Sequence, residues 1–125
     1  MIDNESTNRK FEKELKSGTA ALILLGVISA TGRPMYGYQI TKEIEATADQ
    51  PDDKRLFRQG ALYPVLRSME KNGILKSEIE PSVSGPPRRY YSITEKGGKI
   101  LEDWKATWKR TRDLVDEILK GNNDV

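Results

Sequence analysis

The apolar and polar positions follow their most regular pattern in the middle of the chain, between Gln59 and Gly73. The large apolar residues there recur at i, i+3, i+4 and i+7, which places them on one face of an α-helix. Proline is tolerated near a helix start, so Pro64 predicts that this helix begins close to Gly60. Gly73 predicts its end, because glycine takes the left-handed conformation without strain. The apolar face is expected to hold Leu62, Val65, Leu66 and Met69.

Two more helices are predicted before this one. The first is expected over residues 11–30, and its second half, AALILLGVI, is apolar on nearly all sides. Such a segment must be buried, either in the domain core or against a partner chain. The second helix is expected over residues 36–48, and residues 1–10 are expected to form a flexible polar tail. The core face of the second helix is expected to hold Tyr36, Ile40 and Ile44.

After the central helix the pattern changes from the period of a helix to that of a strand. Residues 75–80 alternate between apolar and polar side chains, as on a half-buried strand. Residues 88–93 predict a returning strand, because two adjacent tyrosines favour β structure. The proline-rich residues 81–87 can only form a loop, so the two strands make a hairpin with a long tip. The buried face of the first strand is expected to hold Leu75, Ser77 and Ile79.

The C-terminal segment predicts a long helix with an apolar seam. Thr94 is a suitable N-cap and Gly121 a suitable stop, with residues 122–125 as a tail. Its members are spaced 3, 4, 3, 4 and 3 apart, which is the heptad pattern of a coiled coil. The seam consists of Leu101, Trp104, Trp108, Thr111, Val115 and Ile118. Together with the first helix, this seam is expected to form a two-fold homodimer. The predicted dimer interface consists of Phe11, Leu15, Leu101, Trp104, Trp108, Val115 and Ile118.

Composition narrows the range of functions. The chain has 125 residues, which suits one domain, and it contains neither cysteine nor histidine. A disulfide framework and a thiolate metal site are therefore excluded, and the commonest general base is missing. No apolar run reaches the length of a membrane span and the N-terminus is charged, so we expect a cytoplasmic protein without membrane contact. No catalytic residue, metal site or cofactor is predicted, and the chain is not expected to be an enzyme.

Charge points to a polyanionic partner. The net charge is only +2, but residues 54–76 contain six Lys or Arg and a single Glu. Lys54 and Arg55 lie just before the central helix, and Lys76 follows it. A local basic surface of this kind attracts a polyanion such as DNA.

The order of the elements predicts the fold class. Three helices followed by a two-stranded hairpin form a winged helix-turn-helix, a mainly α fold with a small β-hairpin (α+β). Residues 11–93 would be the DNA-binding domain and residues 94–121 a dimerisation helix. In this fold the third helix enters the major groove of double-stranded DNA and the hairpin loop contacts the backbone or the minor groove. The expected DNA contacts are Tyr38, Gln39, Lys42, Arg58, Gln59, Gly60, Ala61, Tyr63, Pro64, Arg67, Lys71, Ser84, Gly85, Arg88 and Arg89.

These contacts divide by chemistry. Arg58, Gln59 and Arg67 can make bidentate hydrogen bonds to base edges. Lys and Arg in the other positions can hold phosphates, which adds affinity without sequence information. A winged helix used as a protein-interaction or RNA-binding module, without operator recognition, is the alternative interpretation.

Three segments resemble the PadR family of bacterial transcriptional regulators. They are YGYQITKEIE at 36–45, GALYPVLRSMEKNGIL at 60–75 and GPPRRYYSITEKG at 85–97. The resemblance covers most of residues 20–97. It implies a dimeric winged-helix repressor whose C-terminal helices make the dimer. A dimer with two-fold symmetry is expected to bind an inverted-repeat operator.

The single C-terminal helix resembles the short group of that family, which includes multidrug-binding repressors. The resemblance implies that Trp108 faces its symmetry mate across a central cavity and stacks on a flat aromatic ligand, with Ala21, Leu22 and Leu25 in the cavity wall. Lys105 and Arg112 share a helix face with Trp108, so an anionic aromatic ligand is expected over a cationic one. The spacing of Trp104 and Trp108 fits ordinary packing in the dimer seam equally well. The sequence gives neither the operator nor the direction of regulation.

Overall fold

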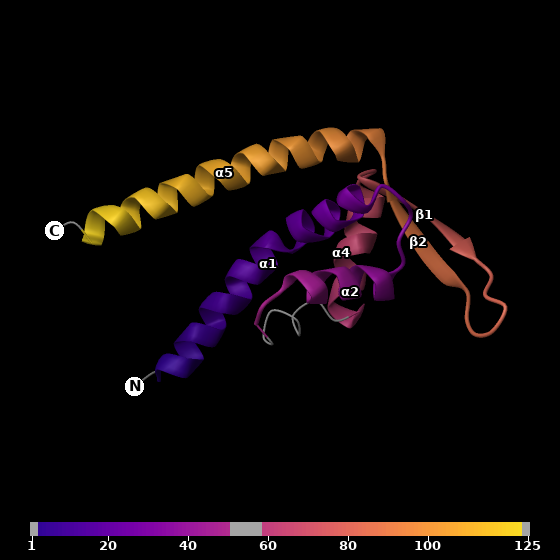
Figure 1. The fold of residues 1–125 in the computed structure, drawn as a ribbon, viewed down its shortest axis with the longest axis horizontal. Coiled ribbons are helices and arrows are strands. Elements are labelled where there is room, and N and C mark those ends of the chain that lie inside the picture. Colours follow the sequence, from indigo (N-terminus) through magenta and orange to yellow (C-terminus); the bar gives the residue numbers. More distant parts are fainter. Residues whose placement is uncertain (1–2, 51–58, 124–125) are drawn as a thin grey trace.

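The computed structural model describes residues 3–50 and 59–123, with the backbone alone for residues 59–60 and 122–123. In chain order its elements are α1 (Asn4–Thr31), α2 (Gly37–Thr47), α4 (Gln59–Lys71), β1 (Leu75–Glu80), β2 (Arg88–Ile93) and α5 (Glu95–Asn123) (Figure 1). The fold is mainly helical with one antiparallel hairpin, as predicted. Figure 1 shows α1 and α5 as two long arms that converge near the hairpin and diverge toward the chain termini.

α1 begins at Asn4, earlier than the predicted start at residue 11. The Asp3 side chain caps this end, because it accepts a hydrogen bond of 2.7 Å from the backbone N–H of Ser6. Glu5 in the first turn adds a favourable interaction with the helix dipole. At the other end Gly32 takes φ 69° and its N–H donates to the Ile28 carbonyl, which confirms the predicted stop.

α2 and α4 form where the pattern predicts them. In α2, Ile40 and Ile44 are buried, but Tyr36, its N-cap, is only half-buried. The apolar face of α4 is confirmed, with Leu62, Leu66 and Met69 buried and Val65 half-buried.

Two special residues shape α4. Pro64 lies inside the helix just after its first turn, at an exposed position, and its ring removes one backbone N–H from the helix. Gly73 takes φ 76° and ends the helix, and the N–H of the next residue, Ile74, donates back to the Met69 carbonyl at 2.9 Å.

The hairpin, here called the wing (residues 75–93), has the predicted strands. Its register runs from Leu75 opposite Ile93 to Glu80 opposite Arg88. On its other edge β2 pairs with Met35, since Met35 and Tyr91 exchange two backbone hydrogen bonds of 2.8 and 2.9 Å. The prediction of a buried face along all of β1 is wrong for Ile79, which is 57% exposed, because the wing projects beyond the helices there (Figure 1).

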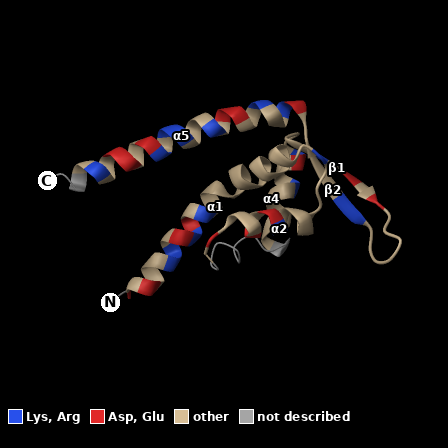
Figure 2. Cartoon of the chain, viewed as in Figure 1, with Lys and Arg blue, Asp and Glu red and all other residues tan. Residues whose placement is uncertain are grey.

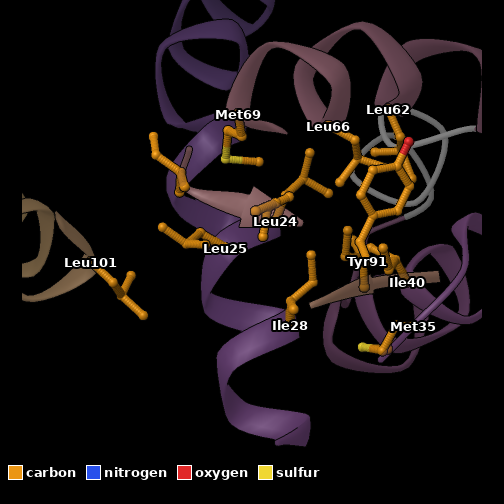
Figure 3. Close-up of a cluster of buried hydrophobic side chains, with 13 residues drawn as sticks. Leu24, Leu25, Ile28, Met35, Ile40, Leu62, Leu66, Met69, Tyr91 and Leu101 are labelled. Atoms are coloured by element: carbon orange, nitrogen blue, oxygen red, sulfur yellow. The ribbon is translucent and has the colours of Figure 1, made fainter. Parts of the chain in front are cut away.

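The hydrophobic core lies where α1 crosses α2, α4 and β2. Leu24, Leu25 and Ile28 of α1 are its centre, and the Tyr91 ring extends toward Leu62 of α4 (Figure 3). By length and composition alone α1 could cross a membrane. Here its apolar half instead supplies the core of a folded domain.

α5 continues past the predicted stop. Gly121 lies inside the helix, which runs to Asn123, because one glycine costs a helix only about 1 kcal/mol relative to alanine. Every described side chain from Lys105 to Gly121 is exposed. Within the described residues the second half of α5 is therefore exposed along its whole length.

The first turn of α5 is bonded to the end of α4. The Thr94 hydroxyl donates to the Gly73 carbonyl at 2.6 Å, and the Thr94 N–H donates to the Ile74 carbonyl at 3.1 Å. The same hydroxyl accepts from the Gly97 N–H at 2.9 Å, which confirms the predicted N-cap. Lys96 adds a hydrogen bond of 2.8 Å to the Asn72 carbonyl. The start of α5 is therefore held to the end of α4 by hydrogen bonds to the backbone carbonyls of residues 72–74.

Candidate nucleic-acid interface

Four tyrosines gather where α2, α4 and the wing meet. The rings of Tyr36 and Tyr90 lie edge to face at 5.2 Å, and Tyr36 stacks on Tyr38 at 6.4 Å. Tyr63 of α4 borders the same place and lies against Gly37, the first residue of α2. A cavity of about 280 Å³ opens here, lined by Tyr36, Tyr38, Tyr63, Ser82, Ser84, Pro86, Pro87, Arg88 and Arg89.

Two cations lie over these rings. The Arg88 guanidinium is 4.6 Å from the centre of the Tyr36 ring, and the Lys42 ammonium is 5.2 Å from that of Tyr38. Glu45 raises the pKa of Lys42 through a hydrogen bond of 3.3 Å and its charge. Arg88 and Lys42 are both exposed, and each lies over a ring at the surface, where an anion can approach; Lys42 also forms an ion pair with Glu45.

Gln39 has a structural task at the start of α2. Its side-chain oxygen accepts a hydrogen bond of 3.1 Å from the Tyr36 N–H. This fixes the side chain as a helix cap and leaves its amide group free to donate. Gln39, Lys42 and Tyr38 together line a second cavity of about 290 Å³ beside α2.

Arg67 lies on the wing side of α4. Burial raises the pKa of Tyr91, Glu70 raises it further, and Arg89 and Arg67 act in the opposite direction. The Tyr91 hydroxyl is buried and has no hydrogen-bond partner among the described residues. Arg67 itself is exposed.

The structure brings together five of the fifteen residues predicted to contact DNA, in the tyrosine-lined cavity. They are Tyr38, Tyr63, Ser84, Arg88 and Arg89. Figure 2 shows the loop end of β2 in the blue of Lys and Arg, and in the sequence β2 begins with Arg88 and Arg89. Tyr36 and Tyr90 belong to the same cluster but were missed, because the pattern assigned Tyr36 to the core and Tyr90 to strand formation only.

Other predicted residues lie elsewhere. Ala61 borders a separate groove between α4 and α1, where Lys13 and Lys16 are its neighbours. Lys71 is exposed in the last turn of α4, and Gly85 is exposed in the wing loop with φ 115°. Arg58 lies outside the described residues, as do Lys54 and Arg55 of the basic segment. The side chains of Gln59 and Gly60 are not described.

A third cavity of about 450 Å³ separates α1 from α5. Of the predicted ligand contacts, it includes Ala21, Leu22 and Trp108. Leu25 is not in the lining, because it is fully buried in the core. The lining residues are Glu14, Leu15, Gly18, Thr19, Ala21, Leu22, Trp104, Thr107, Trp108 and Thr111.

Lys105 and Arg112 do not line this cavity either. Each follows a lining position, Trp104 or Thr111, and so points about a quarter turn around α5. Lys105 pairs with Glu102 at 3.1 Å, and Arg112 approaches Asp113 at 3.4 Å. The lining instead contains the carboxylate of Glu14. In the single chain the described lining therefore contains Glu14 and neither of these two cations.

An apolar stripe runs along the exposed half of α5. Leu101, at the start of the predicted seam, is buried in its own chain and Trp104 is half-buried, so these two belong chiefly to the core. The sequence reading missed Leu114 and Leu119, because a heptad seam follows one line and the stripe is broader. The exposed apolar residues of α1 and α5 are Phe11, Leu15, Trp108, Leu114, Val115, Ile118 and Leu119.

A helix-turn-helix pair followed by a basic hairpin defines a winged-helix DNA-binding domain. Residues 24–103 match the model of the PadR-like family of transcriptional regulators. The chain belongs to the PadR-like family, and it is a DNA-binding transcriptional regulator and not an enzyme.

Solved structures of several family members are similar. A PadR-family regulator from Eggerthella lenta shares 29% identity, with TM-score 0.74, covering 92% of this chain and 94% of that one. A PadR-like regulator from Bacillus cereus shares 27% identity, with TM-score 0.68 and coverages of 85% and 96%. A PadR-like transcription factor from Bacteroides fragilis shares 26%, with TM-score 0.66 and coverages of 87% and 98%. Among curated proteins no significant match was found.

Proposed function

We propose that this chain is a cytoplasmic homodimeric repressor, which binds an inverted-repeat operator and is released by a flat aromatic ligand. The main support for the DNA-binding face is the tyrosine cluster, in which Arg88 and Lys42 lie over two of the rings. It joins α2, α4 and the wing, which are the three elements that a winged helix applies to DNA.

Within this face the roles divide. Arg88 and Lys42 hold backbone phosphates, since each is an exposed cation fixed by an aromatic ring. Tyr63 and Arg67, exposed on α4, enter the major groove, where a guanidinium can bind guanine O6 and N7. The exposed wing loop, residues 81–87, lies against the adjacent backbone or minor groove.

Removing Arg88 tests the phosphate assignment. Arg88→Ala is expected to weaken binding to operator and random DNA alike, and to reduce the slope of log K against log salt by about one unit. The measurement is fluorescence anisotropy at four salt concentrations. Arg110→Ala on α5 removes the same charge far from this face and serves as the control. An unchanged slope for Arg88→Ala would remove it from the phosphate contacts.

The apolar surface of the two long helices supports a dimer. Only 17% of the most apolar window of α1 is buried within one chain. On α5, Leu114, Ile118, Val115 and Leu119 span roughly 140° of the helix circumference at 100° per residue. A stripe this broad exceeds a two-helix seam and fits contact with two helices of a symmetry mate.

The test of the proposed assembly on DNA is a footprint. A two-fold dimer should protect two half-sites of an inverted repeat in the DNA upstream of its own gene, with centres about 34–36 Å apart or a multiple of that distance. A single protected half-site, or no protection, would contradict it.

The link between α5 and α4 supports control by a ligand. A ligand between α1 and α5 that favours one angle of α5 shifts the first turn of that helix, and Thr94 and Lys96 transmit the shift to the end of α4. In a dimer the distance between the two α4 helices would then change, which alters the fit to two half-sites. Binding of the ligand is therefore expected to release the protein from the operator.

The proposed ligand site, the cavity between α1 and α5 that Trp108 lines, is testable with flat aromatic compounds. Because Glu14 is the charged group in the described lining, cationic or neutral aromatics are expected to bind more tightly than matched anionic ones. Trp108→Ala should weaken binding at least about tenfold, since it removes the stacking surface. Titration is followed by fluorescence of the ligand, with Lys109→Ala as the control. Unchanged affinity in Trp108→Ala would exclude this cavity as the ligand site.

A further inference from the structure

Three polar side chains from three elements meet at a single hydroxyl between α4 and the wing. Ser77 of β1 donates a short hydrogen bond to a carboxylate oxygen of Glu70, in the last turn of α4. The same Ser77 oxygen accepts a hydrogen bond of 2.8 Å from the guanidinium of Arg89 on β2. Helix and hairpin are thus joined by a continuous chain of charge-assisted hydrogen bonds.

We propose that Glu70, Ser77 and Arg89 form a positioning bridge that fixes the wing against α4, and that Arg89 serves in this bridge and not as a phosphate contact. The proposal rests on the DNA-binding face described above. It adds that the relative position of the wing and α4 is set by this bridge.

The surroundings favour a structural role for the bridge. Glu70 and Ser77 are both half-buried, so their hydrogen bond is partly shielded from water and is stronger than one at the surface. Tyr91, directly opposite Ser77 in the strand register, is buried, and its hydroxyl makes no hydrogen bond within the described part of the chain. The bridge therefore supplies the polar connection that Tyr91 does not.

The two adjacent wing arginines both border the tyrosine-lined cavity, but their side chains leave β2 on opposite faces of the hairpin. Arg88 pairs with Glu80 in the strand register and Arg89 with Ile79, and successive side chains of a strand alternate between faces. Arg88 lies over the Tyr36 ring, while Arg89 reaches Ser77. Two identical side chains in sequence thus have different partners and different tasks.

Glu70 gives the proposal a sharp electrostatic contrast. A carboxylate close to a DNA-binding surface repels phosphates, so charge alone predicts that Glu70→Ala tightens DNA binding. The bridge predicts the opposite, because the wing loses its attachment to α4. Glu78→Ala is the matched control, since Glu78 is exposed on β1, one position from Ser77, with its side chain on the other face.

The experiment has one readout without DNA and one with it. In the free protein, hydrogen–deuterium exchange of the wing amides should be faster in Glu70→Ala and Ser77→Ala than in wild type and Glu78→Ala. Operator affinity should fall about tenfold in the first two variants, as expected for a lost charge-assisted hydrogen bond. Ser77→Thr keeps the hydroxyl and should restore both values. Arg89→Ala should weaken binding without changing the salt slope.

Each contrary result has one meaning. Unchanged wing exchange in Glu70→Ala and Ser77→Ala overturns the bridge, as does tighter DNA binding by Glu70→Ala. A salt slope reduced in Arg89→Ala as much as in Arg88→Ala overturns the assignment of Arg89. If wild type itself shows no preference for the operator, the proposed function fails, and wing exchange still decides whether the bridge exists.

Discussion

Ile118→Glu is expected to convert the protein from a dimer to a monomer at micromolar concentration and to weaken operator binding about 100-fold or more. The Ile118 side chain is 57% exposed and lies on the part of α5 whose described side chains are all exposed. Two-fold symmetry places the substitution in the interface twice, and each copy would bury an unpaired carboxylate. Operator affinity falls because a monomer binds one half-site and loses the gain from simultaneous engagement of two.

Ala106→Glu is the matched control for this prediction. It adds the same charge to an exposed position of α5, on the side of the helix away from the apolar stripe. Analytical ultracentrifugation should give a dimer for wild type and Ala106→Glu and a monomer for Ile118→Glu. A dimer in all three would exclude the stripe as the interface, while a wild-type monomer would end the proposal of a dimer.

Gly97→Ala is expected to lower the free energy of unfolding by about 3 kcal/mol. A Cβ atom at this position would lie 2.1 Å from the carbonyl oxygen of Ile74 and 2.9 Å from a side-chain carbon of Ile93. The first turn of α5 would have to move away from the end of α4. The hydrogen bonds of Thr94 to Gly73 and Ile74 would then lengthen or break.

The neighbouring Gly98 provides the control. A Cβ there meets nothing within 4 Å, so Gly98→Ala should stabilise the helix by about 0.5–1 kcal/mol. Urea unfolding at equal protein concentration measures both, because the stability of a dimer depends on concentration. If Gly97→Ala unfolds at the same urea concentration as Gly98→Ala, the close contact between Gly97 and the Ile74 carbonyl is refuted.

Local patterns were sufficient for most of the fold. The apolar face of α4, the stop at Gly73 and the N-cap at Thr94 each depend on neighbours within one or two turns, and all three are confirmed. The errors have local causes too. The start of α1 depends on one hydrogen bond, from the Ser6 N–H to Asp3. Gly121 destabilises α5 too little to end it.

The functional face could be predicted only in part, because its contacts join distant segments. Arg88 lies over Tyr36 because the neighbouring Met35 pairs with β2, and no periodicity in the sequence predicts this pairing. The α1–α5 cavity likewise depends on the angle between two helices that are far apart in sequence. For this reason the sequence did not predict Glu14 in its lining.

The central claim is that the face formed by α2, α4 and the wing recognises one DNA sequence. Its most direct test is an anisotropy titration of the full chain at physiological salt against two duplexes of equal length. One carries the DNA upstream of the protein's own gene and the other a scrambled version of it. The account predicts that the upstream duplex binds about 10³-fold more tightly or better. Equal affinity for the two duplexes would contradict it.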